Sequence, residues 1–299
     1  MTAQTFLQSG IPAQDNCPLA ELCSFRIGGS ARVAVFPRTR RELTDALRLI
    51  LREGVPFDVV GNGTNLLYPD GVYEGVLVFT RRMHGAEFTG SDVAAPVGVP
   101  LPALAAEAMR RGLSGLEFAQ GIPGTVGGGV FMNAGAFGGC MADVTEWSDW
   151  LDTETGDVGR FSGAEQRFGT RTSIYEQEKR YILLEAGLHL VSADPADIAR
   201  AMEEFRQRRA RTQPIEMPSA GSVFRHPPGA FAGKLIEDCG LKGTAIGGAE
   251  VSRKHAGFIV NRGGASEQDV RNLIERIREE VYRMTGYRLE CEIRTLTYR

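Results

Sequence analysis

The sequence predicts a protein of mixed helix and strand, in which two small αβ units precede a third segment. Short β-branched runs are typical of strands, and polar capping residues before amphipathic stretches indicate the starts of helices. Two glycine-rich loops lie between these elements. The 299 residues, of which 42% are hydrophobic and 24% charged, have the composition of an ordinary globular protein, and their number suits about two domains.

The first unit is expected to contain three strands and one helix. Its strands are residues 32–36, 57–60 and 75–80. Thr39 and Glu42 form a capping-box signature at the start of the helix, and Gly54 is expected to end it. The apolar face of this helix carries Leu43, Ala46, Leu47 and Ile50.

The second unit contains a helix over 102–112, a glycine-rich segment and a strand over 181–190. A boundary follows, where Asp194 can cap a helix that has Pro195 at its first position. That helix ends in the basic run 206–211. The run is either a solvated helix end that suits the helix dipole or an attraction for a substrate phosphate or carboxylate.

The last part of the chain contains a long helix and a final strand. The helix begins near Ser266, and Gly286 ends it. Its apolar face carries Val270, Leu273, Ile274, Ile277 and Val281. In the strand, residues 289–297, alternation with period two places three charged residues on one face: Glu290, Glu292 and Arg294. Such a face is either the solvated side of an edge strand or part of a site.

A dense glycine cluster occupies residues 115–139, GLEFAQGIPGTVGGGVFMNAGAFGG. Glycines this dense suit a backbone that turns sharply or approaches another group closely. Apolar residues such as Ile122, Val126 and Phe131 argue against a disordered linker. We therefore interpret the segment as an ordered loop around a large ligand.

A second glycine loop, Gly61-Asn62-Gly63, follows a buried strand. It is not the dinucleotide fingerprint, because Leu66 stands where a third glycine is required. It is not a Walker loop either, because the Gly233-Lys234 pair of the chain is followed by Leu235. One such loop is weak evidence, but two in one chain favour a dinucleotide whose phosphates are held by backbone amides.

Composition and charge argue against several classes of function. A net charge of −3 disfavours a nucleic-acid binder. No apolar run approaches the ~20 residues of a membrane span, and the first residues do not form a signal-peptide pattern. The five cysteines form no CxxC pair, which indicates free thiols in a reducing cytoplasm. The four histidines show no ligand spacing, so no metal site is expected.

Eight segments, in order along nearly the whole chain, resemble the UDP-N-acetylenolpyruvoylglucosamine reductases, flavoenzymes that complete UDP-N-acetylmuramate for peptidoglycan. They are SFRIGGSA (24–31), VVGNGTNLL (59–67), the glycine cluster (115–139), RFGTRTS (167–173), QPIEMPSAGSVFRHP (213–227), AGKLIEDCGLKG (232–243), GGAEVSRKHAGFIVN (247–261) and LECEIR (289–294). A flavin oxidase of the same broad fold would share only the glycine loops. The match is to the shorter type of the family, which lacks a substrate-capping insertion.

The resemblance implies three catalytic residues. The family's arginine falls on Arg171, its proton-donating serine on Ser222 and its glutamate on Glu292. Arg171 and a protonated Glu292 would donate hydrogen bonds to the developing enolate, and Ser222 would protonate its carbon. The chain departs from the family pattern at Thr170, Cys140 and His226.

The implied cofactor is noncovalent FAD, and the implied reductant is NADPH. In the two loops, the residues expected to hold FAD are Gly61, Asn62, Gly63, Thr64, Asn65, Leu66, Gly121, Ile122, Pro123, Gly124, Thr125, Gly127, Gly128, Asn133, Ala134 and Gly135. Candidate contacts to the substrate are Arg211, Gln213, Arg225, Lys234 and Lys242. Each of the charged candidates fits ordinary surface charge equally well.

The implied fold is α+β, with two N-terminal αβ subdomains enclosing FAD in a fold of the vanillyl-alcohol-oxidase type, and a C-terminal α+β substrate domain. The expected boundaries are 1–82, 83–194 and 195–288, with 289–299 returning as a strand to the flavin site. The implied reaction reduces UDP-N-acetyl-3-O-(1-carboxyvinyl)-glucosamine to UDP-N-acetylmuramate in the cytoplasm. It would serve peptidoglycan synthesis, cell-wall biogenesis, cell shape and cell division.

Two other functions are compatible with parts of the sequence. One is another FAD-dependent dehydrogenase or oxidase of the same fold that acts on a different small molecule. The other is a noncatalytic protein that binds a nucleotide sugar. The joint presence of Arg171, Ser222 and Glu292 disfavours the second.

Overall fold

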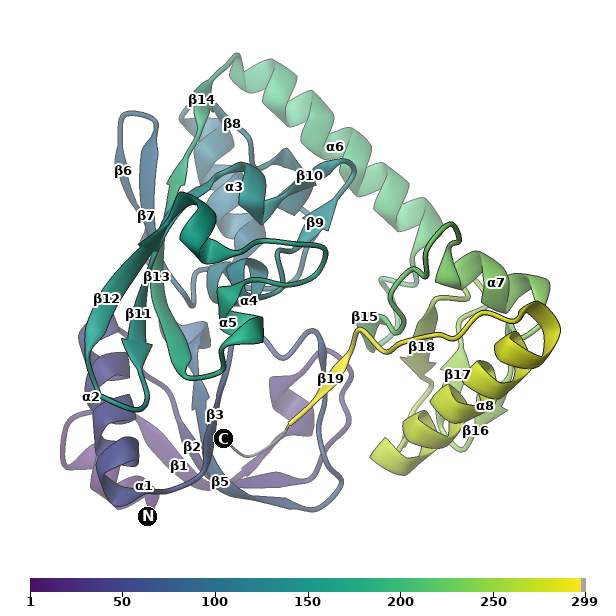
Figure 1. Ribbon diagram of the computed structural model, residues 1–299, viewed down its shortest axis with the longest axis horizontal. Helices are drawn as coiled ribbons and strands as arrows, with labels where there is room; N and C mark the ends of the chain where they lie inside the picture. The colour runs from purple at the N-terminus through teal and green to yellow at the C-terminus, as the bar shows by residue number, and fades with distance from the viewer. Residues whose placement is uncertain (297–299) are drawn as a thin grey trace.

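The structure, a computed structural model, describes residues 1–296. Two sheets with their helices form one side of the molecule, and a smaller unit of helices and short strands forms the other (Figure 1). The long helix α6 (Pro195–Thr212) runs from the second sheet to this smaller unit, and the chain then returns from α8 to the middle of the molecule. The mixed content confirms the predicted α+β class.

The first unit is built on a sheet with the strand order β1-β2-β5-β3. Strands β2 and β3 pair with β5 in parallel, and β1 is an antiparallel edge. Its elements are α1 (Ala3–Leu7), β1 (Ala13–Pro18), β2 (Ser30–Val35), α2 (Arg40–Glu53), β3 (Phe57–Val60), β4 (Leu66–Leu67) and β5 (Val72–Phe79). The three predicted strands are confirmed as β2, β3 and β5.

Helix α2 confirms one half of the predicted capping box. Thr39 Oγ1 accepts a hydrogen bond from the Glu42 N–H (3.1 Å), and Gly54 ends the helix at φ +63°. The Glu42 carboxylate, however, accepts from the N–H of Arg38 (2.8 Å) and not from that of Thr39. It is drawn there by the Arg38 guanidinium, whose hydrogen bonds hold the pKa of Glu42 below its usual value.

The second unit is an antiparallel sheet with the order β12-β11-β13-β7-β6. Its strands are β6 (Glu87–Thr89), β7 (Asp92–Pro96), β11 (Thr145–Asp152), β12 (Val158–Ser162) and β13 (Tyr181–His189). Its helices are α3 (Leu101–Arg110), α4 (Val126–Phe131) and α5 (Ile174–Gln177). Short two-stranded ladders pair β8 (Leu113–Ser114) with β14 (Val191–Ser192), and β9 (Gly135–Ala136) with β10 (Gly139–Cys140).

The sequence predicted that the glycine cluster is an ordered loop. The structure differs, because the middle of the cluster forms the short helix α4. Thr125 caps this helix by accepting a hydrogen bond from the Gly128 N–H (3.3 Å). Glycine disfavours helix by about 1 kcal/mol per residue, so the pattern alone gave no reason to expect one. The buried side chains of Val126 and Val130 anchor the helix in the core and override that preference.

The third unit contains a small antiparallel sheet with the order β15-β18-β17-β16, covered by two helices. Its elements are β15 (Ser219–Ser222), α7 (Ala232–Asp238), β16 (Ala245–Ile246), β17 (Ala249–Val251), β18 (Phe258–Asn261) and α8 (Glu267–Thr285). The capping box that Ser266 forms with Asp269 starts α8, and Gly286 ends it at φ +77°. Both predicted ends of this helix are confirmed.

The final strand is shorter than the predicted 289–297. Strand β19 is Arg294–Thr295 and pairs in parallel with β4, while residue 297 lies outside the described residues. The preceding segment is extended but bonds to a different partner. The Arg225 N–H donates to the Glu290 carbonyl (2.9 Å) and the Glu292 N–H to the Val223 carbonyl (2.7 Å). One segment thus ties the end of β15 to the first glycine loop.

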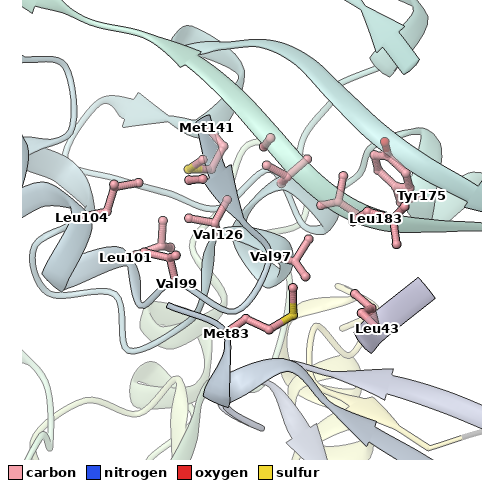
Figure 2. Close-up of a cluster of buried hydrophobic side chains, with 14 of the residues drawn as sticks. Leu43, Met83, Val97, Val99, Leu101, Leu104, Val126, Met141, Tyr175 and Leu183 are labelled. Atoms are coloured by element: carbon pink, nitrogen blue, oxygen red, sulfur yellow. The ribbon is translucent and has the colours of Figure 1, made fainter. Parts of the chain in front are cut away.

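The core consists of two clusters that share the first sheet. Val76 and Val78 of β5 belong to a cluster with the second unit, whereas their neighbours Leu77 and Phe79 belong to a cluster with the third unit. Figure 2 shows part of the first cluster, where apolar side chains of α2, α3, α4 and β13 converge. Because alternate residues of a strand point to opposite faces, β5 joins all three units through apolar contacts.

Candidate active site

A cavity of about 1540 Å³ lies where the three units meet. Both glycine loops line it, together with the end of α6, strand β15 and the C-terminal segment. All of the predicted FAD-binding residues except Asn133 contribute to its wall. Asn133 supports the wall from behind: its buried side chain donates to the Gly169 carbonyl (2.9 Å) and accepts from the Ala142 N–H (2.9 Å).

The two predicted glycine loops touch each other in this cavity. A Cβ on Gly61 would lie 2.4 Å from Thr125 Oγ1, so only glycine permits this approach. The Asn62 side chain donates a hydrogen bond to the Pro123 carbonyl across the contact (2.9 Å). Segments about sixty residues apart in the sequence therefore form one continuous wall.

Other glycines of the cluster divide into two kinds. A Cβ on Gly127 would collide with Val97 of the protein core at 2.8 Å. A Cβ on Gly124 or Gly128 would meet nothing closer than 3.8 Å. All three glycines line the cavity, but only beside Gly124 and Gly128 is the space for a side chain not filled by protein and open to a ligand.

Arg171 and Glu292 form an ion pair in the wall of the cavity. Arg171 Nε donates to Glu292 Oε1 (2.9 Å), and Arg171 Nη2 donates to the Gly135 carbonyl (3.2 Å). The Arg171 backbone lies in the left-handed region at φ +57°, which is unusual for a residue with a side chain. The side chains of Arg171 and Glu292 are 34% and 19% exposed, so both reach the cavity.

Ser222 lies at the end of β15 and lines the same cavity. The hydrogen bond from the Glu292 N–H to the Val223 carbonyl places the serine segment beside the glutamate segment. Within residues 1–296, the Ser222 hydroxyl makes no hydrogen bond and is available to a ligand. Arg171, Ser222 and Glu292, predicted from three distant segments, thus face one space.

Glu290, by contrast, is exposed and does not line the cavity. The alternation in the sequence placed it on the same face as Glu292. In the structure only Glu292 lines the cavity, although the two residues flank the antiparallel bridge that Cys291 forms with Phe224.

A network around Arg294 and Glu176 was not predicted from the sequence. Arg294 Nη1 pairs with Glu176 Oε1 (3.1 Å), and the Thr172 hydroxyl donates to Glu176 Oε2 (3.1 Å). Glu176 is thereby linked to the residue after Arg171. The backbone of Arg294 also donates to the Asn65 carbonyl in the first glycine loop (3.0 Å). The period-two pattern that placed Arg294 with Glu292 was the signal for its position at the site.

The predicted substrate contacts differ in their positions. Gln213 and Arg225 line the cavity, whereas Arg211, Lys234 and Lys242 do not. Lys234 pairs with Asp238, and Lys242 with Glu237 (2.7 Å). Arg206 and Arg209, in the basic run at the end of α6, do line the cavity and were not singled out. Of the departures from the family pattern, Thr170 and His226 line the cavity and Cys140 does not.

One group of side chains that could ligate a metal ion lies outside the cavity. In the described part of the chain it consists of Asp92, Glu146 and His189, all exposed, whose ligand atoms lie within 4.8 Å of one another. The three residues lie away from the cavity wall.

No helix in residues 1–296 is long and apolar enough to cross a membrane.

Two sequence models of protein families match the chain. The model of the UDP-N-acetylenolpyruvoylglucosamine reductase C-terminal domain matches residues 213–296, and that of an FAD binding domain matches residues 31–162. The two matches together contain Ser222, Glu292 and both glycine loops. The cofactor of the protein is therefore FAD.

Known proteins similar to this chain carry the same family name. UDP-N-acetylenolpyruvoylglucosamine reductases from Caldicellulosiruptor bescii and Oceanobacillus iheyensis are 46% and 41% identical to it. These alignments cover 95% and 96% of this chain, and 91% and 94% of the relatives. The crystal structure of UDP-N-acetylenolpyruvylglucosamine reductase from Thermus caldophilus is 34% identical, with a TM-score of 0.81 over 96% of this chain and 99% of that one. The chain therefore belongs to the UDP-N-acetylenolpyruvoylglucosamine reductase family.

Proposed function

We propose that this chain uses NADPH to reduce the enol ether of UDP-N-acetyl-3-O-(1-carboxyvinyl)-glucosamine, giving UDP-N-acetylmuramate. Membership of an FAD-dependent reductase family supports this reaction. The observation that carries the assignment of residues is that Arg171, Ser222 and Glu292 line one cavity with both glycine loops. A noncatalytic nucleotide-sugar binder would have no use for this trio beside a flavin.

The residues of the cavity fit FAD. Gly124 and Gly128 leave open space that any larger side chain would enter, and Gly61 lets the two loops meet. We propose that residues 61–66, 121–125, 127 and 128, with Ala134 and Gly135, hold the cofactor, and that Asn133 supports them. When bound, FAD carries a hydride from NADPH to the enol ether. The link is proposed to be noncovalent, because neither loop contains a histidine or a cysteine.

Arg171 and Glu292 would stabilise negative charge on the substrate. Hydride addition to the terminal carbon of the enol ether leaves charge on the adjacent carbon, C2, and on the carboxylate attached to it. The guanidinium of Arg171 is fixed by Glu292 and by the Gly135 carbonyl, so it can donate hydrogen bonds without first reorganising. Glu292 Oε2 has no partner within the described residues, and a proton on that oxygen would make it a second donor.

Ser222 would complete the reaction by delivering a proton to C2. A hydroxyl is a weak acid in water, but a carbon that has just gained electron density is a strong base. The Ser222 hydroxyl is free of protein partners in the described part of the chain, so its proton can point into the cavity. Proton transfer from a positioned group typically contributes about 10²–10⁴-fold to a rate.

The division of labour between the units is also a proposal. Residues 1–82 and 83–194 would form the two FAD-binding subdomains, 195–288 the substrate domain, and 289–299 the returning segment. The positions of the three main sheets support this division, since each lies within one of the ranges. The product would serve peptidoglycan synthesis in the cytoplasm, and through it cell shape and cell division.

Substrate-dependent oxidation of NADPH by the purified protein tests the proposal. Beyond the NADPH that reduces the bound flavin once, we expect continued oxidation of NADPH only when the enolpyruvyl sugar nucleotide is present, with one NADPH oxidised per substrate reduced. Flavin that is reduced by NADPH but reoxidised only by oxygen would favour another FAD-dependent dehydrogenase or oxidase of the same fold. A protein that binds the sugar nucleotide but carries no flavin absorbance would be a noncatalytic binder.

A further inference from the structure

Arg209, in the last turn of α6, reaches the cavity with an incompletely bonded guanidinium. Its Nε is fully buried and has no hydrogen-bond partner in the described structure. Its Nη1 donates one long hydrogen bond to Gln213 Oε1 (3.3 Å). Other arginines of α6 are neutralised on the same helix, Arg200 by Asp197 and Arg206 by Glu203. Arg209 therefore differs from the solvated charges of this basic run.

The surroundings of Arg209 are shaped to hold this side chain. A Cβ on Gly121 would lie 2.6 Å from Arg209 Nε, so the absence of a side chain there makes room for the guanidinium. The ring of Phe137 lies 5.6 Å from the guanidinium carbon and is itself stacked on Phe205 of α6 at 4.6 Å. The glycine cluster and the helix thus meet around one half-buried cation, whose Nε is fully buried.

This arrangement is unfavourable without an anion. Burial removes water from a charge, and the pKa of Arg209 is accordingly lowered from its usual value. Four carboxylates line the cavity, those of Glu21, Asp58, Glu216 and Glu292, but none pairs with Arg209 within residues 1–296. A bound anion would supply the missing charge and accept the free N–H groups.

We propose that Arg209 is a phosphate-binding residue that holds the diphosphate of a nucleotide in the cavity. The inference rests on the proposed function, in which every ligand of the site contains a diphosphate attached to a nucleoside. The planar guanidinium, with several N–H groups in a fixed fork, matches phosphate oxygens. The substrate carboxylate is assigned to Arg171, which leaves the diphosphate for Arg209. The diphosphate belongs either to the flavin dinucleotide or to a nucleotide that enters the flavin-loaded enzyme.

Binding measurements on flavin-loaded protein distinguish these sources. For Arg209→Gln, the release of flavin on dilution is followed by flavin fluorescence, and the affinities for UDP and for NADP⁺ are measured by calorimetry. Loss of a hydrogen bond to a charged group predicts a dissociation constant raised about 10- to 100-fold. Weaker flavin retention assigns Arg209 to FAD. Unchanged flavin retention with weaker UDP or NADP⁺ binding assigns it to the entering nucleotide.

Two control variants keep the test decisive. Arg208→Gln removes a neighbouring exposed cation that also lies over Phe137 but does not line the cavity, and all three affinities should stay unchanged. Arg209→Lys keeps the positive charge without the planar set of guanidinium N–H donors, and it should recover part of the affinity. The thermal midpoint of flavin-free Arg209→Gln should not fall, because the variant loses a half-buried charge that no carboxylate compensates. Unchanged affinities for FAD, UDP and NADP⁺, or a loss of stability without a loss of affinity, would overturn the proposal. If Arg209→Gln weakens flavin or nucleotide binding as expected, but the unmodified protein does not turn over the enolpyruvyl substrate, only the proposed reaction would be contradicted.

Discussion

At the scale of single residues, the site depends on the contact between Arg171 and Glu292. The left-handed backbone of Arg171 is strained, and it persists because the side chain is held at both ends, by Glu292 and by the Gly135 carbonyl. A glutamine at position 292 would keep the shape of the side chain and an oxygen that can accept from Arg171, but it would lose the ionisable carboxyl group.

We expect Glu292→Gln to retain FAD and to turn over about 10²- to 10³-fold more slowly, the usual cost of losing one group that stabilises developing charge. Glu290→Gln is the matched control, since Glu290 is exposed and outside the cavity. It should stay close to the unmodified rate. Substrate-dependent oxidation of NADPH and the flavin absorbance per protein measure both properties. The opposite ranking of the two variants would move the catalytic role two residues upstream.

Ser222 allows the two halves of the reaction to be separated. If this serine only protonates C2, it takes no part in the transfer of hydride from NADPH. Ser222→Ala should therefore lose flavin absorbance on mixing with NADPH at the normal rate. Reoxidation by the enolpyruvyl substrate should slow by at least the ~10²–10⁴-fold of general acid catalysis. Stopped-flow absorbance follows each phase.

Ser222→Cys provides the complementary result, because a thiol can also donate a proton. We expect it to keep part of the reoxidation rate that Ser222→Ala loses. Normal reoxidation of Ser222→Ala by substrate would make the residue part of a turn, with the proton coming from elsewhere.

At the scale of elements, the glycine cluster separates positions that face ligand from positions that face protein. Gly124→Val and Gly128→Val should fold but fail to retain flavin, because the new side chain enters the cavity. Gly127→Val should lower the stability of the protein itself by about 1–3 kcal/mol, because its Cβ would meet Val97 of the core. Flavin absorbance per protein and a thermal melt of flavin-free protein measure the two effects. Full flavin occupancy in both Gly124→Val and Gly128→Val would mean that FAD does not approach this loop.

The network of Glu176 and Arg294 ties the C-terminal segment to the Arg171 loop. Removing either partner alone should lower kcat/KM by about tenfold, since the remaining charge would be half-buried and unpaired. Because both residues act through the same contact, Glu176→Gln and Arg294→Leu together should cost less than the sum of the single changes. Strictly additive effects on kcat/KM would show that the two residues do not act as a pair.

Elements with strong local signals could be predicted from the sequence, and elements set by tertiary contacts could not. Helices α2, α6 and α8 begin at the residues that the capping patterns indicated, because Thr39, Asp194 and Ser266 each bond to the next turn. Helix α4 was missed, since its glycines disfavour helix and only packing stabilises it. The C-terminal strand was predicted too long, because its hydrogen bonds are shared between two different partners.

At the scale of the whole molecule, the cavity was predictable only through the family resemblance. Arg171, Ser222 and Glu292 come from segments that no local pattern connects. These three residues lie close together only because the two faces of β5 hold the second and third units against the first sheet. The same long-range packing decided which arginines of the basic run face the cavity. The pattern indicated a charged helix end, but the burial of Arg209 follows only from its contact with the glycine cluster.

The way in which the folded molecule holds its flavin leads to a final prediction. A cysteine and a histidine do line the cavity, but neither is prepared to bond to a flavin. Burial raises the pKa of the Cys23 thiol, which makes the reactive thiolate scarce, and the thiol donates a hydrogen bond to the Ile27 carbonyl (Sγ to O, 3.4 Å). His226 Nδ1 already accepts from the Ala232 N–H (3.3 Å). The flavin should thus be held only by the folded walls. Acid precipitation, which unfolds those walls, should release the yellow colour into the supernatant, from Cys23→Ser as well as from the unmodified protein. A pellet that stays yellow, and becomes colourless only in Cys23→Ser, would contradict noncovalent binding and identify the linked residue.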